Sequence, residues 1–202
     1  MQDFDASKML PNVNDTMLVI DKRDNKTYTA ARLADGRVWM TQNLALDIDA
    51  TKTYTPADTD LTENWKPSRS SIASDNLTAK TWVNDYYKPY SYSSGNPTLG
   101  NYYNWSAAVA MNNSSNLTSG YATTSICPKG WALPQREDYV NLSAAYGLPT
   151  ENEDSTTAYQ VLEADPLNFT RAGYVYDGIL SKYNGYGYYW TSTVKNKSYA
   201  YR

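Results

Sequence analysis

The segment that decides the fold runs from Cys127 to Leu142 and reads Cys-Pro-Lys-Gly-Trp-Ala-Leu-Pro-Gln-Arg-Glu-Asp-Tyr-Val-Asn-Leu. Pro134 lacks a backbone N–H and biases the residue before it to an extended conformation, so a helix should begin just after it, near Gln135. Residues recur at helical spacing and should form one buried stripe: Tyr139, Leu142 and Tyr146. The segment therefore predicts a short buried turn that leads into an amphipathic helix.

The N-terminal part of the chain has the pattern of an antiparallel meander. Met17–Asp21 and Thr27–Leu33 are rich in residues that favour strands, and Arg37–Met40 follows them. The turn between the second and third strands contains Asp35-Gly36, a pair that favours tight hairpin geometry. We expect three neighbouring strands here.

The motif Cys-Pro-x-Gly-Trp-x-Leu-Pro at 127–134, followed by an acidic helix, resembles the Fibrobacter succinogenes major paralogous domain. More distantly, it is similar to the fold shared by C-type lectins and sulfatase-modifying enzymes. Further segments match the family in the same order: Asp35–Leu44, Tyr102–Ala108, Phe169–Gly173 and Tyr189–Thr193. The resemblance implies an α+β, C-type-lectin-like fold with antiparallel sheets, a few short helices and long irregular loops. It also implies a secreted or surface-anchored bacterial protein.

The whole chain, residues 1–202, is expected to form one such domain. Asn104 should cap a helix from Trp105 to about Asn112, and Ser155 should cap another that ends near Glu163. The later strands are predicted in three segments: Phe169–Tyr176, Tyr188–Thr193 and Ser198–Arg202. Tryptophans within the matching motifs are expected in the core: Trp39, Trp105, Trp131 and Trp190.

Residues 47–100 interrupt this pattern with a long stretch rich in Ser, Thr, Asn, Asp and Pro. So long a loop usually binds something or carries short elements of its own. Its many aromatic residues argue against disorder. We therefore expect an ordered insertion that packs on the domain.

The family resemblance also implies one more strand after Arg202, and that strand usually carries a cysteine. We expect the C-terminal strand to be missing here, through truncation or because another segment completes the sheet. An incomplete sheet would leave an edge that invites pairing with a neighbouring chain.

Composition excludes several classes of function. The chain contains no His, which rules out Ser-His-Asp and Cys-His catalysis as well as His-ligated zinc. The net charge of -3 gives no electrostatic case for nucleic acid. No apolar run approaches the roughly 20 residues of a membrane span. The polar start, Met1–Phe4, lacks the apolar region of a signal peptide, so the chain is either cytoplasmic or a mature or trimmed form.

The remaining candidates for chemistry are weak. Cys127 is the only cysteine, has no identifiable base to activate it, and is read as a buried thiol or an orphaned half-disulfide. Acidic pairs such as Asp21 with Asp24, or Asp47 with Asp49, lack the ligand pattern of a calcium loop. Glu137 and Asp138 are adjacent on the predicted helix and point different ways, which does not suit glycoside hydrolysis. We therefore expect no enzyme activity, no cofactor and no metal.

The unusual feature is 20 Tyr against 2 Phe. Tyrosine offers contact area and a hydrogen bond at low entropic cost, which is typical of binding faces. The candidate binding residues are Trp82, Tyr86, Tyr87, Tyr90, Tyr92, Tyr183 and Tyr186. The alternative is that these rings simply pack a long loop onto the sheet.

The sequence thus predicts non-catalytic recognition or adhesion at a bacterial surface. The expected partner is a glycan or a protein ligand on a surface. The alternative is a structural subunit of an extracellular fibre or surface layer, whose partners are copies of itself joined through sheet edges.

Overall fold

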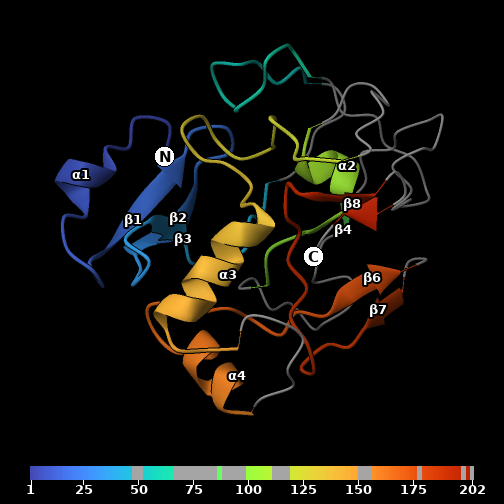
Figure 1. The fold of residues 1–202 in the computed structure, drawn as a ribbon. Coiled ribbons are helices and arrows are strands. Elements are labelled where there is room, and N and C mark those ends of the chain that lie inside the picture. Colours follow the sequence, from blue (N-terminus) through green and yellow to red (C-terminus); the bar gives the residue numbers. More distant parts are fainter. Residues whose placement is uncertain are drawn as a thin grey trace.

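The N-terminal meander forms as predicted. In the computed structural model, β1 (Thr16–Asp21), β2 (Lys26–Arg32) and β3 (Val38–Met40) form an antiparallel sheet in that order (Figure 1). Ala31 of β2 pairs with Thr16 on one side and with Trp39 on the other. Each predicted boundary is confirmed to within one residue.

The structure describes residues 1–46, 52–65, 86–87, 99–110, 119–149, 156–176, 179–196 and 199–200. For residues 86–87, 106, 156–157, 176, 196 and 199 it describes the backbone alone. All statements below concern these parts of the chain.

The central helix α3 (Arg136–Ala145) begins where Pro134 predicts. Gln135 is its N-cap, and the backbone N–H of Gln135 donates to the Asp138 carboxylate at 2.8 Å. This carboxylate also suits the positive end of the helix dipole. Beyond the helix, Gly147 adopts a φ of 66°, the left-handed conformation expected of a helix-terminating glycine.

The remaining elements are short. The helices are α1 (Ala6–Met9), α2 (Trp105–Ala108) and α4 (Thr156–Glu163). The strands form antiparallel pairs: β4 (Tyr86–Tyr87) with β5 (Tyr102–Tyr103), β6 (Tyr174–Tyr176) with β7 (Ile179–Ser181), and β8 (Val194–Asn196) with β9 (Tyr199–Ala200). The protein is therefore a mixed structure of antiparallel sheets and a few short helices, joined by long irregular stretches.

Three predicted elements differ from the structure. The strand predicted over 188–193 is wrong, because Ser192 instead donates its N–H to the Pro134 carbonyl and accepts a hydrogen bond from Ala122, both at 2.8 Å. The strand predicted from Phe169 is shorter and begins at Tyr174. The helix predicted to reach Asn112 already ends at Ala108, and Ala110 takes a left-handed φ of 49°.

Side chains of α3 pack on both the first sheet and α4, and the helix lies between the first sheet and α4 in the ribbon (Figure 1). Leu142 is buried with Ala31, Leu33 and Leu167, and Val161 and Leu162 of α4 pack against them. This contact places α3 across the middle of the molecule, between the first sheet and the C-terminal strands. Trp105, at the start of α2, is buried as predicted.

The described part of the predicted insertion, residues 52–65, contacts the core. Tyr54 and Trp65 pair through two backbone hydrogen bonds of 2.8 Å, and Trp65 is completely buried beside Leu61 and Ile126. Most of residues 66–98 lies outside the described residues. That 47–100 forms one ordered insertion, and that the chain is a single domain, both remain predictions.

Candidate functional site

A cavity of about 440 Å³ lies at the centre of the protein, and we call it the central cavity. It lies between β3, the loop that precedes α3, the first turn of α3 and the segments that flank β6. Its size is within the range of small-molecule sites. Its described aromatic lining consists of Trp39, Tyr102, Tyr103, Trp131, Tyr139, Phe169, Tyr174, Tyr188, Tyr189 and Trp190.

Three of the four tryptophans expected in the core line this cavity instead. Trp39, Trp131 and Trp190 are each half-buried, and Trp131 and Leu133 pack against different clusters of buried residues. Tryptophan is large and carries an N–H that needs a partner, so it is seldom fully buried. That property is the signal in the sequence that could have indicated a lined cavity.

The aromatic wall is held together by ring contacts around Tyr139 of α3. The Tyr139 ring centroid lies 5.4 Å from that of Trp39, 6.3 Å from Phe169 and 6.5 Å from Tyr189. Phe169 and Tyr189 meet edge to face at 5.1 Å. Tyr139 of α3 therefore contacts a ring of β3 and the rings of Phe169 and Tyr189, which lie in two later segments of the chain.

Most polar groups of the wall are already bonded within the protein. The indole N–H groups of Trp39, Trp131 and Trp190 donate to the Asp35 carboxylate, the Met1 carbonyl and the Tyr103 carbonyl, at 3.0, 3.2 and 2.7 Å. The Tyr189 hydroxyl accepts from the Thr170 N–H at 2.7 Å and donates to the Thr170 carbonyl at 2.5 Å. The Tyr102 hydroxyl donates to the Ala172 carbonyl at 2.7 Å. Burial raises the pKa of Tyr102 to about 12, so the phenol is neutral at physiological pH.

Two charged side chains line the described part of the cavity, and they neutralise each other. The Arg37 guanidinium donates to the Asp138 carboxylate. The Asp138 carboxylate also accepts a hydrogen bond from the N–H of Gln135, the N-cap of α3, so contacts with both Arg37 and the start of the helix fix its position. The pair leaves no net charge facing the cavity from these residues.

Cys127 also lines the cavity and is half-buried. Burial raises the pKa of its thiol to about 11, and the nearby Arg23 guanidinium lowers it only in part. A thiol with so high a pKa is a poor nucleophile at neutral pH. That Cys127 has no catalytic use remains a prediction.

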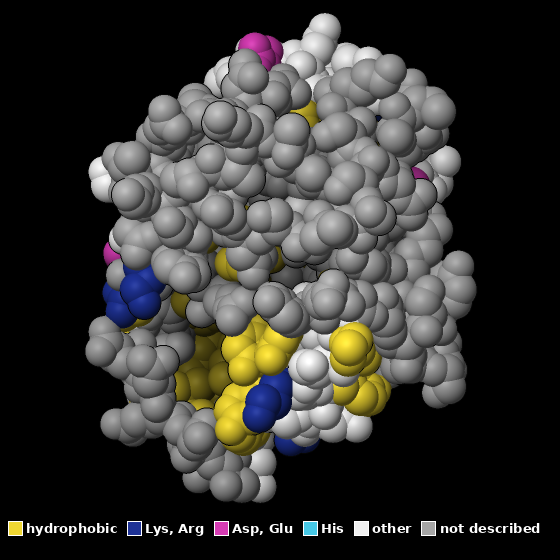
Figure 2. Space-filling model, turned by 90° about the vertical axis from the view of Figure 1, so that its right-hand side faces the viewer, with side chains coloured by type: hydrophobic (Ala, Val, Ile, Leu, Met, Phe, Trp, Pro, Cys, Tyr) yellow, Lys and Arg dark blue, Asp and Glu magenta, His cyan; other side chains and the backbone are white. Residues whose placement is uncertain are grey.

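A second feature is a group of tyrosines around β6 and β7, which we call the tyrosine surface: Tyr183 and Tyr186 are exposed, and Tyr174 and Tyr188 are half-buried. The Tyr188 ring lies 5.0 Å from Tyr174, edge to face, and 6.2 Å from Tyr186. The Lys182 ammonium lies over the Tyr186 ring, 5.6 Å from its centroid. Figure 2 shows hydrophobic side chains gathered around a hollow on this side of the molecule, next to basic side chains.

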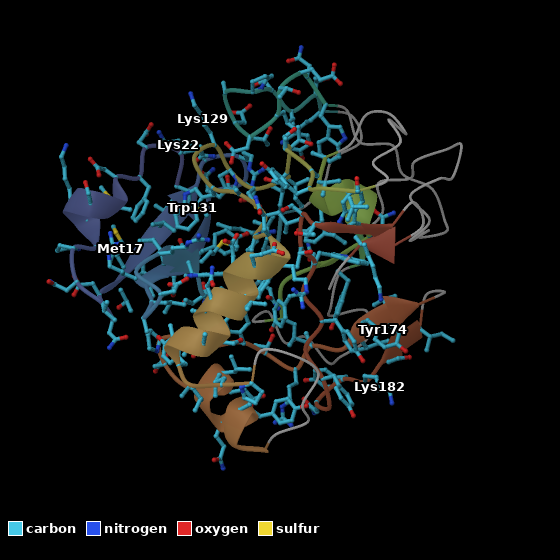
Figure 3. All side chains as sticks on the ribbon, viewed as in Figure 1. Met17, Lys22, Lys129, Trp131, Tyr174 and Lys182 are labelled. Atoms are coloured by element: carbon cyan, nitrogen blue, oxygen red, sulfur yellow. The ribbon has the colours of Figure 1, made fainter. Side chains whose placement is uncertain are left out.

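The tyrosine surface continues into the central cavity. Tyr174 and Tyr188 belong to both, whereas Tyr183 and Tyr186 are 37% and 38% exposed. In Figure 3, Tyr174 and Lys182 lie on one side of α3 and Trp131 lies on the other. Trp131 and Tyr174 both line the cavity.

The predicted binding residues are described only in part. Trp82, Tyr90 and Tyr92 lie outside the described residues. Tyr86 and Tyr87 form β4, whose backbone pairs with Tyr103 and Tyr102, and their side chains are not described. Tyr188 also lay in the group of Tyr and Trp residues considered for binding, whereas Tyr174 did not, because Tyr174 reads as part of a strand.

Acidic groups do not gather into a metal or catalytic site in the described part of the chain, where no three potential ligands come together. Asp21, one of the calcium candidates, is instead buried against Arg23. Asp47 and Asp49 lie outside the described residues. No helix in the described structure is both long and apolar enough to span a membrane.

Comparison with known proteins adds no relative: no family model, no curated protein and no solved structure matches the chain.

Proposed function

We propose that this protein is a non-catalytic recognition module of a secreted or surface-attached bacterial protein, with a C-type-lectin-like fold. It binds a polymeric ligand, a glycan or a protein, on a surface. The fold proposal is supported by the order of the motifs, in which a meander precedes the Cys-Pro-x-Gly-Trp-x-Leu-Pro turn and its helix. The location rests on the resemblance alone.

The observation that supports recognition best is the tyrosine surface. Tyr183 and Tyr186 expose more than a third of their area, and Ile179 of the neighbouring strand is 66% exposed. The Lys182 ammonium lies over the Tyr186 ring, a cation–π contact that favours this ring position. Rings held in this way can stack on a sugar face or a peptide with little loss of side-chain entropy.

Affinity electrophoresis in gels that contain a panel of polysaccharides, together with pull-down on immobilised surface proteins, tests this proposal. Tyr186→Ala and Tyr183→Ala should abolish retardation or capture without changing thermal stability. Tyr121→Ala is the matched control, because Tyr121 is 52% exposed but contacts none of the rings of the tyrosine surface. Equal binding by all three variants would contradict the proposal.

A second candidate is a structural subunit joined to copies of itself through sheet edges. It is supported by β1, the outer strand of the first sheet, where Leu18 and Ile20 are 68% and 52% exposed. An edge strand with exposed apolar side chains invites strand pairing. Light scattering over a concentration series should then show association that Leu18→Lys removes. A monomer at every concentration would exclude this candidate.

A further inference from the structure

We propose that the central cavity is a second binding site, whose ligand differs from that of the tyrosine surface. This ligand is a neutral, mainly apolar small molecule that contains a ring. Such a molecule would carry one hydrogen-bonding group that pairs with the Tyr139 hydroxyl. The proposal goes beyond recognition of a polymer and does not depend on it.

The charge of the cavity argues for a neutral ligand. Arg37 and Asp138 are the charged side chains among the described lining residues, and they bond to each other. The N-terminal ammonium of Met1, another lining residue, donates to the Ile20 carbonyl. A charged ligand would have to lose its hydration without gaining a partner of opposite charge, which is strongly unfavourable. An uncharged molecule meets no such penalty.

The hydrogen bonds of the wall argue for an apolar ligand. The three indole N–H groups and the hydroxyls of Tyr102 and Tyr189 are already bonded to carbonyls or carboxylates of the protein. The Asn43 amide likewise donates to the Leu99 carbonyl and to Thr170. A ligand with many hydroxyls, such as a free sugar, would leave most of them without partners, and each would cost free energy. The rings therefore present mainly their carbon faces.

Tyr139 is the exception in this wall. Its ring is fixed by Trp39, Phe169 and Tyr189, yet its hydroxyl makes no hydrogen bond to any described residue. Burial raises the pKa of this phenol, so it stays protonated and can donate as well as accept. This fixed phenol therefore offers a polar contact to a ligand in the cavity.

The first test uses a matched pair of fluorescent probes, N-phenyl-naphthylamine and anilinonaphthalene sulfonate, which share a ring skeleton and differ by one sulfonate. The neutral probe should bind with enhanced fluorescence, and the sulfonate should bind at least about tenfold more weakly. The neutral probe should also protect Cys127, the only cysteine and a lining residue, from alkylation by a maleimide. Equal binding of both probes, or binding without protection of Cys127, would overturn the proposal.

The second test uses variants. Val175→Trp places a large ring at a half-buried lining position of β6 and should abolish probe binding in a protein that still unfolds cooperatively. Tyr139→Phe should keep the cavity open but remove its polar group. Naphthol should displace the neutral probe about fivefold better than naphthalene from the unaltered protein, and equally well from Tyr139→Phe. Unchanged probe binding in Val175→Trp, or the same naphthol preference in both proteins, would place the site elsewhere.

Different variants test the two proposed sites independently. Tyr186→Ala should lose the polymer and keep the probe, since Tyr186 is outside the described lining of the cavity. Val175→Trp should lose binding of the probe and keep binding of the polymer. That result would show that the two ligands use different residues.

Discussion

Arg23 and Asp21 form a buried ion pair, with Arg23 Nη2 lying 2.5 Å from Asp21 Oδ2 and both side chains almost fully enclosed. Asp21 ends β1, and the other terminal nitrogen of Arg23 donates to the Ile126 carbonyl at 2.5 Å. The pair therefore connects the first hairpin to the residue that precedes the Cys-Pro motif. Breaking it should loosen the attachment of the meander to the cavity wall.

Asp21→Asn is expected to lower the free energy of unfolding by about 3–5 kcal/mol, because it leaves the Arg23 charge buried without a counter-charge. Urea denaturation at neutral pH measures the loss. Asp3→Asn is the control, because Asp3 pairs with Lys22 on the open surface and should change stability little. A loss for Asp21→Asn no larger than that for Asp3→Asn would show that the pair is not buried.

The same residue predicts how stability depends on pH. Burial alone would raise the pKa of Asp21, but the hydrogen bonds and charge of Arg23 outweigh it and hold the pKa below its usual value. A lowered carboxyl pKa contributes stability that is fully present above the unfolded value of about 3.9 and is lost as the pH falls through the folded value. The stability difference between the unaltered protein and Asp21→Asn should therefore shrink below about pH 4. Urea unfolding at a series of pH values tests this, and a constant difference would contradict it.

Cys127 should react slowly with thiol reagents. A pKa of about 11 leaves about one thiol in a thousand ionised at pH 8. The alkylation rate by iodoacetamide should rise about tenfold per pH unit up to pH 10 without a plateau, and unfolding in urea should restore the profile of an ordinary cysteine. Cys127→Ser should retain polymer binding. A plateau near pH 8 in the folded protein would mean that the thiol is activated.

The hydroxyls of two neighbouring tyrosines should differ in their effect on stability. Tyr189→Phe removes the acceptor of the Thr170 N–H and should cost about 1–3 kcal/mol. Tyr139→Phe removes a hydroxyl without a described partner and should change stability by less than about 1 kcal/mol. Thermal or chemical denaturation of the two variants measures both. Equal losses would mean that Tyr139 is bonded in solution.

Local signals in the sequence predicted the elements that depend on neighbouring residues. Pro134 placed the start of α3, and the strand-forming segments on either side of the Asp35-Gly36 turn placed the first sheet. The central cavity could not be predicted in this way, because its wall combines segments far apart in the sequence, such as those of Trp39 and Tyr139. The strand predicted over 188–193 failed for a related reason, since the Pro134 carbonyl and the Ala122 N–H, both distant in sequence, bond to the backbone of Ser192.

Gly173, which ends the Phe169–Gly173 motif, should tolerate no side chain. It has a φ of 70°, and a Cβ there would lie 2.2 Å from the Ser181 carbonyl oxygen and 2.7 Å from the Tyr183 nitrogen. Gly36 is a matched control, because its φ of 80° is similar but a Cβ there would meet no atom within 4 Å. Gly36→Ala should therefore cost only the backbone strain, about 1–2 kcal/mol.

Gly173→Ala should cost clearly more, because β7 must also move away from β6. That movement would shift Tyr174 and Tyr183, so the variant should weaken polymer binding as well. Chemical denaturation and affinity electrophoresis measure the two effects, and equal stability losses for the two variants would show that β6 and β7 do not approach so closely.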